Sequence, residues 1–144
     1  MAGFVTSDAV GYLGDCMFGE NVLAKYKLPY IYDVAEYRKT IRKVGELNLA
    51  YYVLSHGEVT TTIQKTADQN LAIVDRVESD LLAMLNSRRS FEDVLQLICD
   101  KMDIHLDIAQ YALVGNTIRS FLSYLYNEGK IRCEIIDNRL YWVI

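Results

Sequence analysis

Two side chains of metal-binding type follow short apolar runs in this chain, and each has a glycine beside it. Asp15 follows residues 10–14, and His56 follows residues 51–55 and precedes Gly57. Carboxylate oxygen and imidazole nitrogen are ordinary zinc ligands, at roughly 2.0–2.2 Å. Because zinc sites use three or four protein ligands, this pair alone would make an incomplete site.

The elements around these two residues are predicted to bring them to one edge of a sheet. Residues 10–13 and 51–55 are expected to be strands, with a helix over residues 34–47 between them. Its apolar stripe consists of Val34, Tyr37, Ile41 and Val44. A strand, crossover helix and strand in one sheet makes the two strands parallel. Their carboxyl ends then meet at the edge where α/β proteins usually hold ligands.

The pattern becomes helical from about residue 62. A long helix over residues 63–86 is expected to link two pieces of the chain. Its apolar positions are Leu71, Val74, Val77, Leu81 and Leu85. In the second piece, Ser90 followed by Asp93 predicts a capped helix start. The buried face of that helix is expected to contain Phe91, Val94, Leu95, Ile98 and Met102.

The last part of the chain is predicted to contain more helix and then a hairpin. A short helix or turn is expected over residues 107–113, followed by a stronger helix that ends at Glu128-Gly129-Lys130. The face of the stronger helix consists of Val114, Ile118, Phe121, Leu122 and Leu125. Two β-rich runs then flank Asp137-Asn138, a pair that tolerates a tight turn. Three helices followed by a hairpin is the plan of a winged helix, here residues 87–144.

Composition narrows the functional classes. The chain has 144 residues, 51% of them apolar, and a formal net charge of −4, which disfavours general attraction to nucleic acid or anionic membranes. Cys16, Cys99 and Cys133 are far apart and odd in number, which indicates free thiols in a reducing compartment. We find no signal peptide and no membrane span, and therefore expect a cytoplasmic protein without a membrane partner.

Residues 14–20, Gly-Asp-Cys-Met-Phe-Gly-Glu, and residues 54–57, Leu-Ser-His-Gly, resemble two motifs of the metallo-β-lactamase superfamily. The resemblance is to the carboxyl-terminal half of these hydrolases. The long helix and winged-helix tail, ending near Gly129-Lys130-Ile131, resemble members related to β-lactamase-like protein 2, which include RNA-cleaving enzymes. The motif order, the spacing of about forty residues and the tail together carry the resemblance.

The resemblance implies an α/β fold, α+β overall, made of half of an αββα sandwich and a winged-helix domain. The expected organisation is a partial metallo-β-lactamase segment over residues 1–62, a linking helix over 63–86 and the winged helix over 87–144. Asp15 would bridge two metal ions, with zinc the expected metal, and His56 would complete the shell of the second. In the complete protein a metal-bound hydroxide would attack the substrate.

The chain departs from the superfamily in its main ligand set. The His-x-His-x-Asp-His run is absent, and only two histidines exist, His56 and His105. The chain is therefore expected to be a carboxyl-terminal portion that is inactive by itself, with metal absent or only partly bound. Its expected partners are a missing amino-terminal half and, in the complete protein, a small-molecule or RNA substrate. A half-sandwich would also expose a sheet, so a homo-oligomer is another expectation.

Other interpretations stay open. Asp15 has the alternative role of a turn former and His56 that of an ordinary loop residue, in which case the likeness is accidental and the chain is a stand-alone interaction protein. The winged helix has an alternative role in binding nucleic acid or a protein partner. Between Ser90 and Ile144 acidic side chains outnumber basic ones by eight to five, which favours a protein contact over duplex binding.

Overall fold

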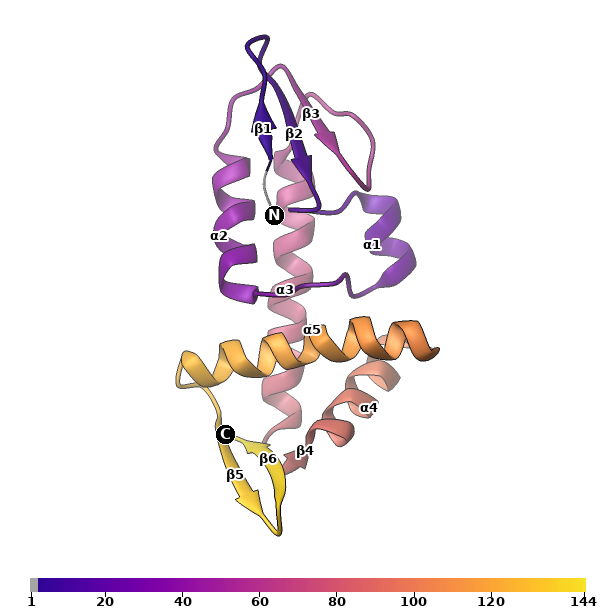
Figure 1. The fold of residues 1–144 in the computed structure, drawn as a ribbon, viewed down its shortest axis with the longest axis vertical. Helices are drawn as coiled ribbons and strands as arrows, with labels where there is room; N and C mark the ends of the chain where they lie inside the picture. The colour runs from indigo at the N-terminus through magenta and orange to yellow at the C-terminus, as the bar shows by residue number, and fades with distance from the viewer. Residues whose placement is uncertain (1–2) are drawn as a thin grey trace. The chain divides into compact units, whose positions relative to one another are not determined.

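The computed structural model describes residues 3–144, which form two compact units (Figure 1). The first unit takes the described residues up to Pro29 together with Ala35–Val74, and the second takes Tyr30–Val34 together with Asp75–Ile144. The domain boundaries expected at residues 62 and 86 stay a prediction. Over residues 3–144, no helix combines the length and apolar character that crossing a bilayer needs.

The first unit is a small sheet with helices packed on it. Its elements are β1 (Phe4–Val5), β2 (Val10–Gly14), α1 (Glu20–Tyr26), α2 (Val34–Gly45), β3 (Tyr51–Leu54) and the first half of α3 (Gln64–Met84). The strand order is β1-β2-β3, with β1 antiparallel to β2. Strands β2 and β3 are parallel, as the strand-helix-strand pattern predicted.

Each face of this sheet has a different environment. Leu13, Tyr52 and Leu54 are buried on one face. On the other face Tyr12 stacks on Phe4, with ring centroids 4.8 Å apart, and both rings are exposed. The strands therefore alternate between a buried face and an apolar face that stays in contact with solvent.

Helices α2 and α3 run beside each other in the first unit. Tyr37, Ile41 and Val44 of α2 are buried, as their helical spacing predicted. Gly45, the last residue of α2, lies beside Ala67 of α3, since a Cβ at position 45 would be 3.7 Å from the Ala67 Cβ. Helix α2 ends two residues earlier than the sequence predicted.

The second unit contains the rest of α3, two further helices and a three-stranded antiparallel sheet (Figure 1). Its elements are β4 (Arg89–Ser90), α4 (Phe91–Met102), α5 (Ile108–Asn127), β5 (Arg132–Ile136) and β6 (Arg139–Val143). Strand β6 lies between β4 and β5. The core consists of fully buried apolar side chains from α4 and α5, among them Ile98, Ile118, Phe121, Leu122 and Leu125.

Helix α4 begins and ends at recognisable caps. The Asp93 N–H donates to the Ser90 hydroxyl at 3.2 Å, and the Ser90 N–H donates to the Asp93 carboxylate at 2.9 Å. This capping box confirms the predicted helix start. Val94, Leu95, Ile98 and Met102 are buried as expected, whereas Phe91, at the first position of the helix, is only half-buried. At the other end, Asp103 adopts the left-handed conformation with φ 51° and closes the helix.

The expected short helix or turn over residues 107–113 is wrong as a separate element. It is the first part of α5, which runs without interruption from Ile108 to Asn127. Asp107 is its N-cap and accepts a hydrogen bond from the Gln110 N–H at 2.7 Å. No proline interrupts the helix, and Gly115 faces Phe91, so this weak helix former is accommodated by packing.

The hairpin between β5 and β6 follows its turn residues. Asp137 and Asn138 both have positive φ, 50° and 62°, which is the geometry of a two-residue turn that matches strand twist. Gly129 also has positive φ, 68°, just past the end of α5. The end of that helix and the hairpin are therefore confirmed where the sequence predicted them.

Candidate functional site

Asp15 and His56 lie together in the first unit. The Nε2 atom of His56 is 3.5 Å from the Oδ1 atom of Asp15. Strand β2 ends at Gly14, whose positive φ of 58° turns the chain just before Asp15. His56 lies two residues beyond the end of β3. The predicted meeting of these two side chains at one edge of the sheet is confirmed.

The parallel pairing of β2 and β3 explains why residues so distant in sequence meet. Gly14 is opposite Leu54 in the register, after an irregularity that begins at Tyr12. The Ser55 N–H donates to the Gly14 carbonyl at 3.4 Å, so the pairing continues to the last residue before Asp15. The segments that carry Asp15 and His56 therefore leave the sheet at the same level.

The loops that follow the two strands are packed directly on each other. The Gly19 N–H donates to the His56 carbonyl at 2.8 Å. A Cβ at position 19 would be 2.8 Å from the Gly57 Cα, which is closer than real Cβ contacts. Glycine at position 19 therefore allows the backbone contact that holds the His56 loop in place.

A buried asparagine fixes the loop that carries Asp15. Asn70 of α3 accepts hydrogen bonds from the Phe18 N–H at 3.0 Å and the Tyr37 hydroxyl at 2.7 Å. Its amide group donates to the Phe18 carbonyl at 2.8 Å and the Thr66 carbonyl at 2.7 Å. Every hydrogen-bonding position of this buried amide is used, so the network holds Phe18 in one place.

Phe18 connects that network to the histidine. Its ring is stacked with the His56 ring, with centroids 6.2 Å apart and planes inclined by 17°. Burial raises the pKa of Tyr37, with a smaller contribution from the Cys16 thiol, so the hydroxyl stays protonated as the donor to Asn70. Two contacts therefore position His56. The Phe18 ring stacks on its imidazole, and the Gly19 N–H holds its backbone carbonyl.

The two candidate ligands themselves face solvent. The side chains of His56 and Asp15 are 58% and 45% exposed. Cys16, next in sequence, is half-buried, and burial raises the pKa of its thiol. The arrangement is an accessible pair of side chains, followed in sequence by a half-buried thiol.

The distance between the pair fits a shared metal ion. Two ligands at roughly 2.0–2.2 Å from a tetrahedral metal lie roughly 3.3–3.6 Å apart. Among residues 3–144 no third histidine, cysteine or acidic side chain joins a metal-binding cluster. These residues therefore fit part of a metal site, which needs further ligands from elsewhere.

The other histidine is far from this arrangement in the chain and has a different setting. His105 lies in the turn after α4, with its Nε2 atom 3.6 Å from the Asp103 Oδ1 atom. Both side chains are almost fully exposed, at 95% and 76%. His105 is therefore a surface residue.

The sequence did not predict the positioning roles of three residues, Phe18, Tyr37 and Asn70. A signal existed for one of them. Asn70 stands on the same helical stripe as Ala67, Val74 and Val77, and a polar residue on a buried stripe needs hydrogen-bonding partners. The identity of those partners depends on tertiary contacts that the sequence pattern does not contain.

Comparisons with solved structures identify the fold. A β-lactamase domain protein from Burkholderia ambifaria matches 98% of this chain with a TM-score of 0.78 and 15% identity. A metallo-β-lactamase family protein from Thermus thermophilus matches 97% of the chain with a TM-score of 0.71 and 16% identity. No protein-family model and no curated protein matches the chain.

The chain therefore has a mixed α/β fold found in metallo-β-lactamase family proteins, and the expected resemblance is confirmed at the level of fold. The chain spans 43% and 44% of the lengths of the two solved structures, less than half of each.

Proposed function

We propose that this chain is the carboxyl-terminal portion of a metal-dependent hydrolase of the metallo-β-lactamase superfamily. The observation that carries the proposal is the His56–Asp15 pair, 3.5 Å apart beyond two adjacent parallel strands of this fold. Asp15 and His56 are forty-one positions apart in the sequence, so their pairing is not a local contact. It is instead produced by the sheet register and by the backbone contact between Gly19 and His56.

In this proposal the two side chains are metal ligands with different roles. Asp15 has two carboxylate oxygens, so it is able to bridge two ions, and His56 provides one nitrogen as a terminal ligand. Zinc is the metal that best suits this donor set, and when bound it supplies Lewis-acid chemistry that lowers the pKa of water. Phe18 and Gly19 keep the imidazole in the orientation that ligation requires.

The remaining ligands are proposed to come from an amino-terminal half that this chain lacks. The exposed face of the first-unit sheet supports this, because Phe4, Tyr12 and Tyr51 are 63%, 41% and 50% exposed there. Aromatic side chains gathered on one sheet face favour a covering partner over water. A second copy of the chain is the alternative cover, and in that case the purified chain would be a dimer.

The test is metal analysis and hydrolase screening of a longer protein that contains the upstream half. Asp15→Ala and His56→Ala are expected to remove most of the bound metal and the activity. Asp103→Ala and His105→Ala are matched controls and are expected to change neither. Full metal content and activity in both site variants would contradict the proposed roles.

Small molecules and RNA both suit hydrolysis by a metal-activated water, and screening of the longer protein should include phosphodiester and thioester substrates. A cytoplasmic location agrees with the three free cysteines, Cys16, Cys99 and Cys133.

The second unit is proposed to be a winged helix with an interaction role. Its support is the order of elements in the second unit, in which the second half of α3 provides the first of three helices and is followed by β4, α4, α5 and the β5–β6 hairpin, whose second strand pairs with β4. Because acidic side chains outnumber basic ones in this tail, a protein partner is favoured over duplex DNA. Filter binding at low salt tests this, and tight, salt-sensitive binding of duplex would contradict it.

A further inference from the structure

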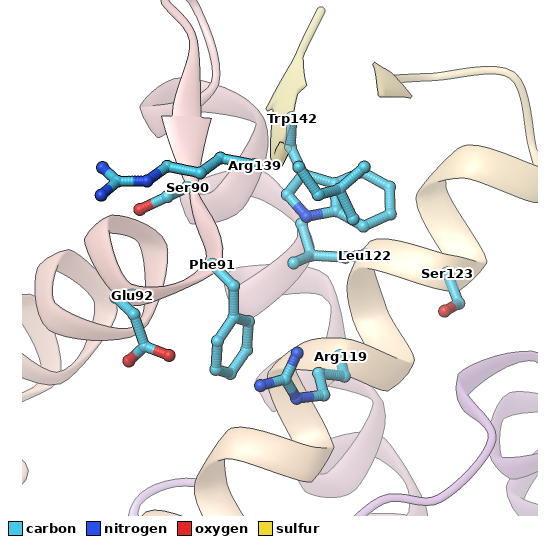
Figure 2. Close-up of a pocket in the computed structure, with 9 residues that line it drawn as sticks. Ser90, Phe91, Glu92, Arg119, Leu122, Ser123, Arg139 and Trp142 are labelled. Carbon is cyan, nitrogen blue, oxygen red and sulfur yellow. The ribbon is translucent and has the colours of Figure 1, made fainter. Parts of the chain in front are cut away.

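A pocket of about 670 Å³ opens on the second unit, between the start of α4, the middle of α5 and strand β6 (Figure 2). Its apolar lining comes from Phe91, Leu122, Leu140 and Trp142, and two arginines, Arg119 and Arg139, also line it. This volume is within the range of small-molecule sites, roughly 300–1,000 Å³. The pocket is remote in sequence from Asp15 and His56 and belongs to one unit only.

Arg119 forms a flat platform at the pocket. Its guanidinium carbon lies 3.4 Å from the centroid of the Phe91 ring, so one face of the guanidinium is stacked on the ring. Figure 2 shows the guanidinium of Arg119 reaching toward Phe91. A stacked guanidinium keeps its second face and its in-plane N–H groups for other partners. Planar aromatic groups and oxyanions are the partners that such a group prefers.

Trp142 lines the pocket with its indole. Its indole Nε1 is buried and has no hydrogen-bond partner within residues 3–144. Arg89, directly opposite Trp142 in the pairing of β4 with β6, has a buried Nε in the same condition. Both nitrogens are shielded from solvent and Arg89 does not line the pocket, so what this pair offers a ligand is the apolar ring surface of Trp142.

The local charge of the pocket differs from that of the tail. Arg119 and Arg139 contribute two positive charges, while Glu92 contributes one negative charge. The Glu92 carboxylate accepts hydrogen bonds from the Tyr111 hydroxyl at 3.0 and 3.2 Å, which occupies it in part. The pocket lining is thus net positive, which favours an anionic ligand. Because the unit around it is negative overall, a small anion is favoured over a long phosphate backbone.

We propose that this pocket binds a nucleoside monophosphate, either free or as the terminal nucleotide of a single strand. The base stacks on the open face of the Arg119 guanidinium, and the phosphate pairs with arginine N–H groups at the rim. A nucleobase supplies the planar surface and the acceptor atoms, and the phosphate supplies the charge. This inference is independent of the metal site, so the failure of one leaves the other standing.

Trp142 is the only tryptophan in the chain, and its fluorescence therefore reports directly on the pocket. The full chain is titrated with adenosine monophosphate, with excitation at the red edge of the indole absorption, where adenine is transparent. Saturable quenching is expected. Adenosine without phosphate and inorganic phosphate without a base are expected to bind at least about tenfold more weakly, since each lacks one of the two interactions.

The source of the nucleotide is distinguished by a second titration with a short 5′-phosphorylated single-stranded oligonucleotide. Tighter binding than the mononucleotide assigns the pocket to strand ends, and equal or weaker binding assigns it to free nucleotides. Equal quenching by adenosine and adenosine monophosphate would overturn the proposal. So would tighter quenching by an acidic aromatic peptide than by either nucleotide, because the pocket would then be a peptide site.

Variants complete the test. Arg119→Gln and Arg139→Gln are each expected to weaken binding of adenosine monophosphate by about fivefold or more. Arg132→Gln is the matched control, because Arg132 is exposed on β5 of the same unit and does not line the pocket. Its affinity is expected to stay within about twofold of the wild type. If both pocket variants bind as tightly as the control while keeping a native circular dichroism spectrum, the proposal is wrong.

Discussion

Two histidine–aspartate pairs in this chain have nearly the same separation but opposite constructions. His56 and Asp15 are 3.5 Å apart and come from loops that follow two different strands. His105 and Asp103 are 3.6 Å apart and come from one exposed turn after α4. The first pair depends on the sheet, a buried asparagine and two glycines, whereas the second needs only a local turn. A short distance between two side chains therefore does not identify a site by itself. The surrounding structure that maintains the distance is the better evidence.

Of the variants that separate the two pairs, Asn70→Ala is expected to have the largest effect on stability. The change leaves the Phe18 N–H and carbonyl and the Tyr37 hydroxyl without their buried partners. We expect the free energy of unfolding to fall by about 2–4 kcal/mol, measured by urea denaturation. The nuclear magnetic resonance signals of the His56 ring should shift as Phe18 moves, while those of His105 should not.

Asn86→Ala is the control for that variant, since Asn86 is exposed just beyond the end of α3. It should change the stability by less than about 0.5 kcal/mol. If Asn70→Ala were equally mild, the buried amide would not be what holds the Asp15 loop.

The next effect is expected from Gly19→Ala. The new Cβ would meet the Gly57 Cα at 2.8 Å and the His56 carbonyl oxygen at 3.1 Å, so the two loops must separate. We expect a loss of about 1–3 kcal/mol and a changed His56 environment. Gly45→Ala is the matched control, because its nearest atom at 3.4 Å is the end of the Gln64 side chain. A neutral result at position 19 would show that the loops are not locked by this contact.

A smaller effect is expected from Ser90→Ala, which acts on the helix that carries the second pair. The variant removes the hydroxyl that caps the Asp93 N–H of α4. A loss of about 1 kcal/mol is expected by thermal or chemical denaturation. Ser79→Ala, at an exposed position of α3, is the control and should be neutral. The resonances of His56 should stay unchanged, and a shift there would contradict the separate construction of the two pairs.

The smallest predicted effect is a pH dependence of the same cap. Hydrogen bonds from the side chain and backbone of Ser90 lower the pKa of Asp93. The contribution of a carboxylate with a lowered pKa is present above the unfolded value, roughly 3.9, and is lost as the pH falls through the folded value. The stability difference between the wild type and Asp93→Asn should therefore shrink on acidification. The control is Ser79→Ala, at an exposed position of α3, which changes no carboxylate and should differ from the wild type by the same small amount at every pH.

Much of this fold could be predicted because periodic apolar residues and cap residues act locally. The stripe of α2, the Ser90 cap and the Asp137-Asn138 turn each depend on neighbours within a few residues. The short strands β1 and β4 and helix α1 were missed, because two to seven residues are too few to show a period.

The candidate site could be predicted only in part. The meeting of Asp15 and His56 follows from the topology of parallel strands, which the sequence pattern contains. The roles of Asn70 and Phe18 do not, because their contact spans 52 residues and depends on how α3 packs. The division of α5 was predicted wrongly, since a capping aspartate at position 107 starts one helix rather than a separate turn.

The most direct test of the metal-ligand claim is a zinc titration of the chain followed by the ring signals of its two histidines. The account predicts that zinc shifts or broadens His56 at lower concentrations than His105, and that Asp15→Asn removes this preference while Asp103→Asn keeps it. Equal responses of both histidines in the wild-type chain, or an unchanged His56 response in Asp15→Asn, would contradict it.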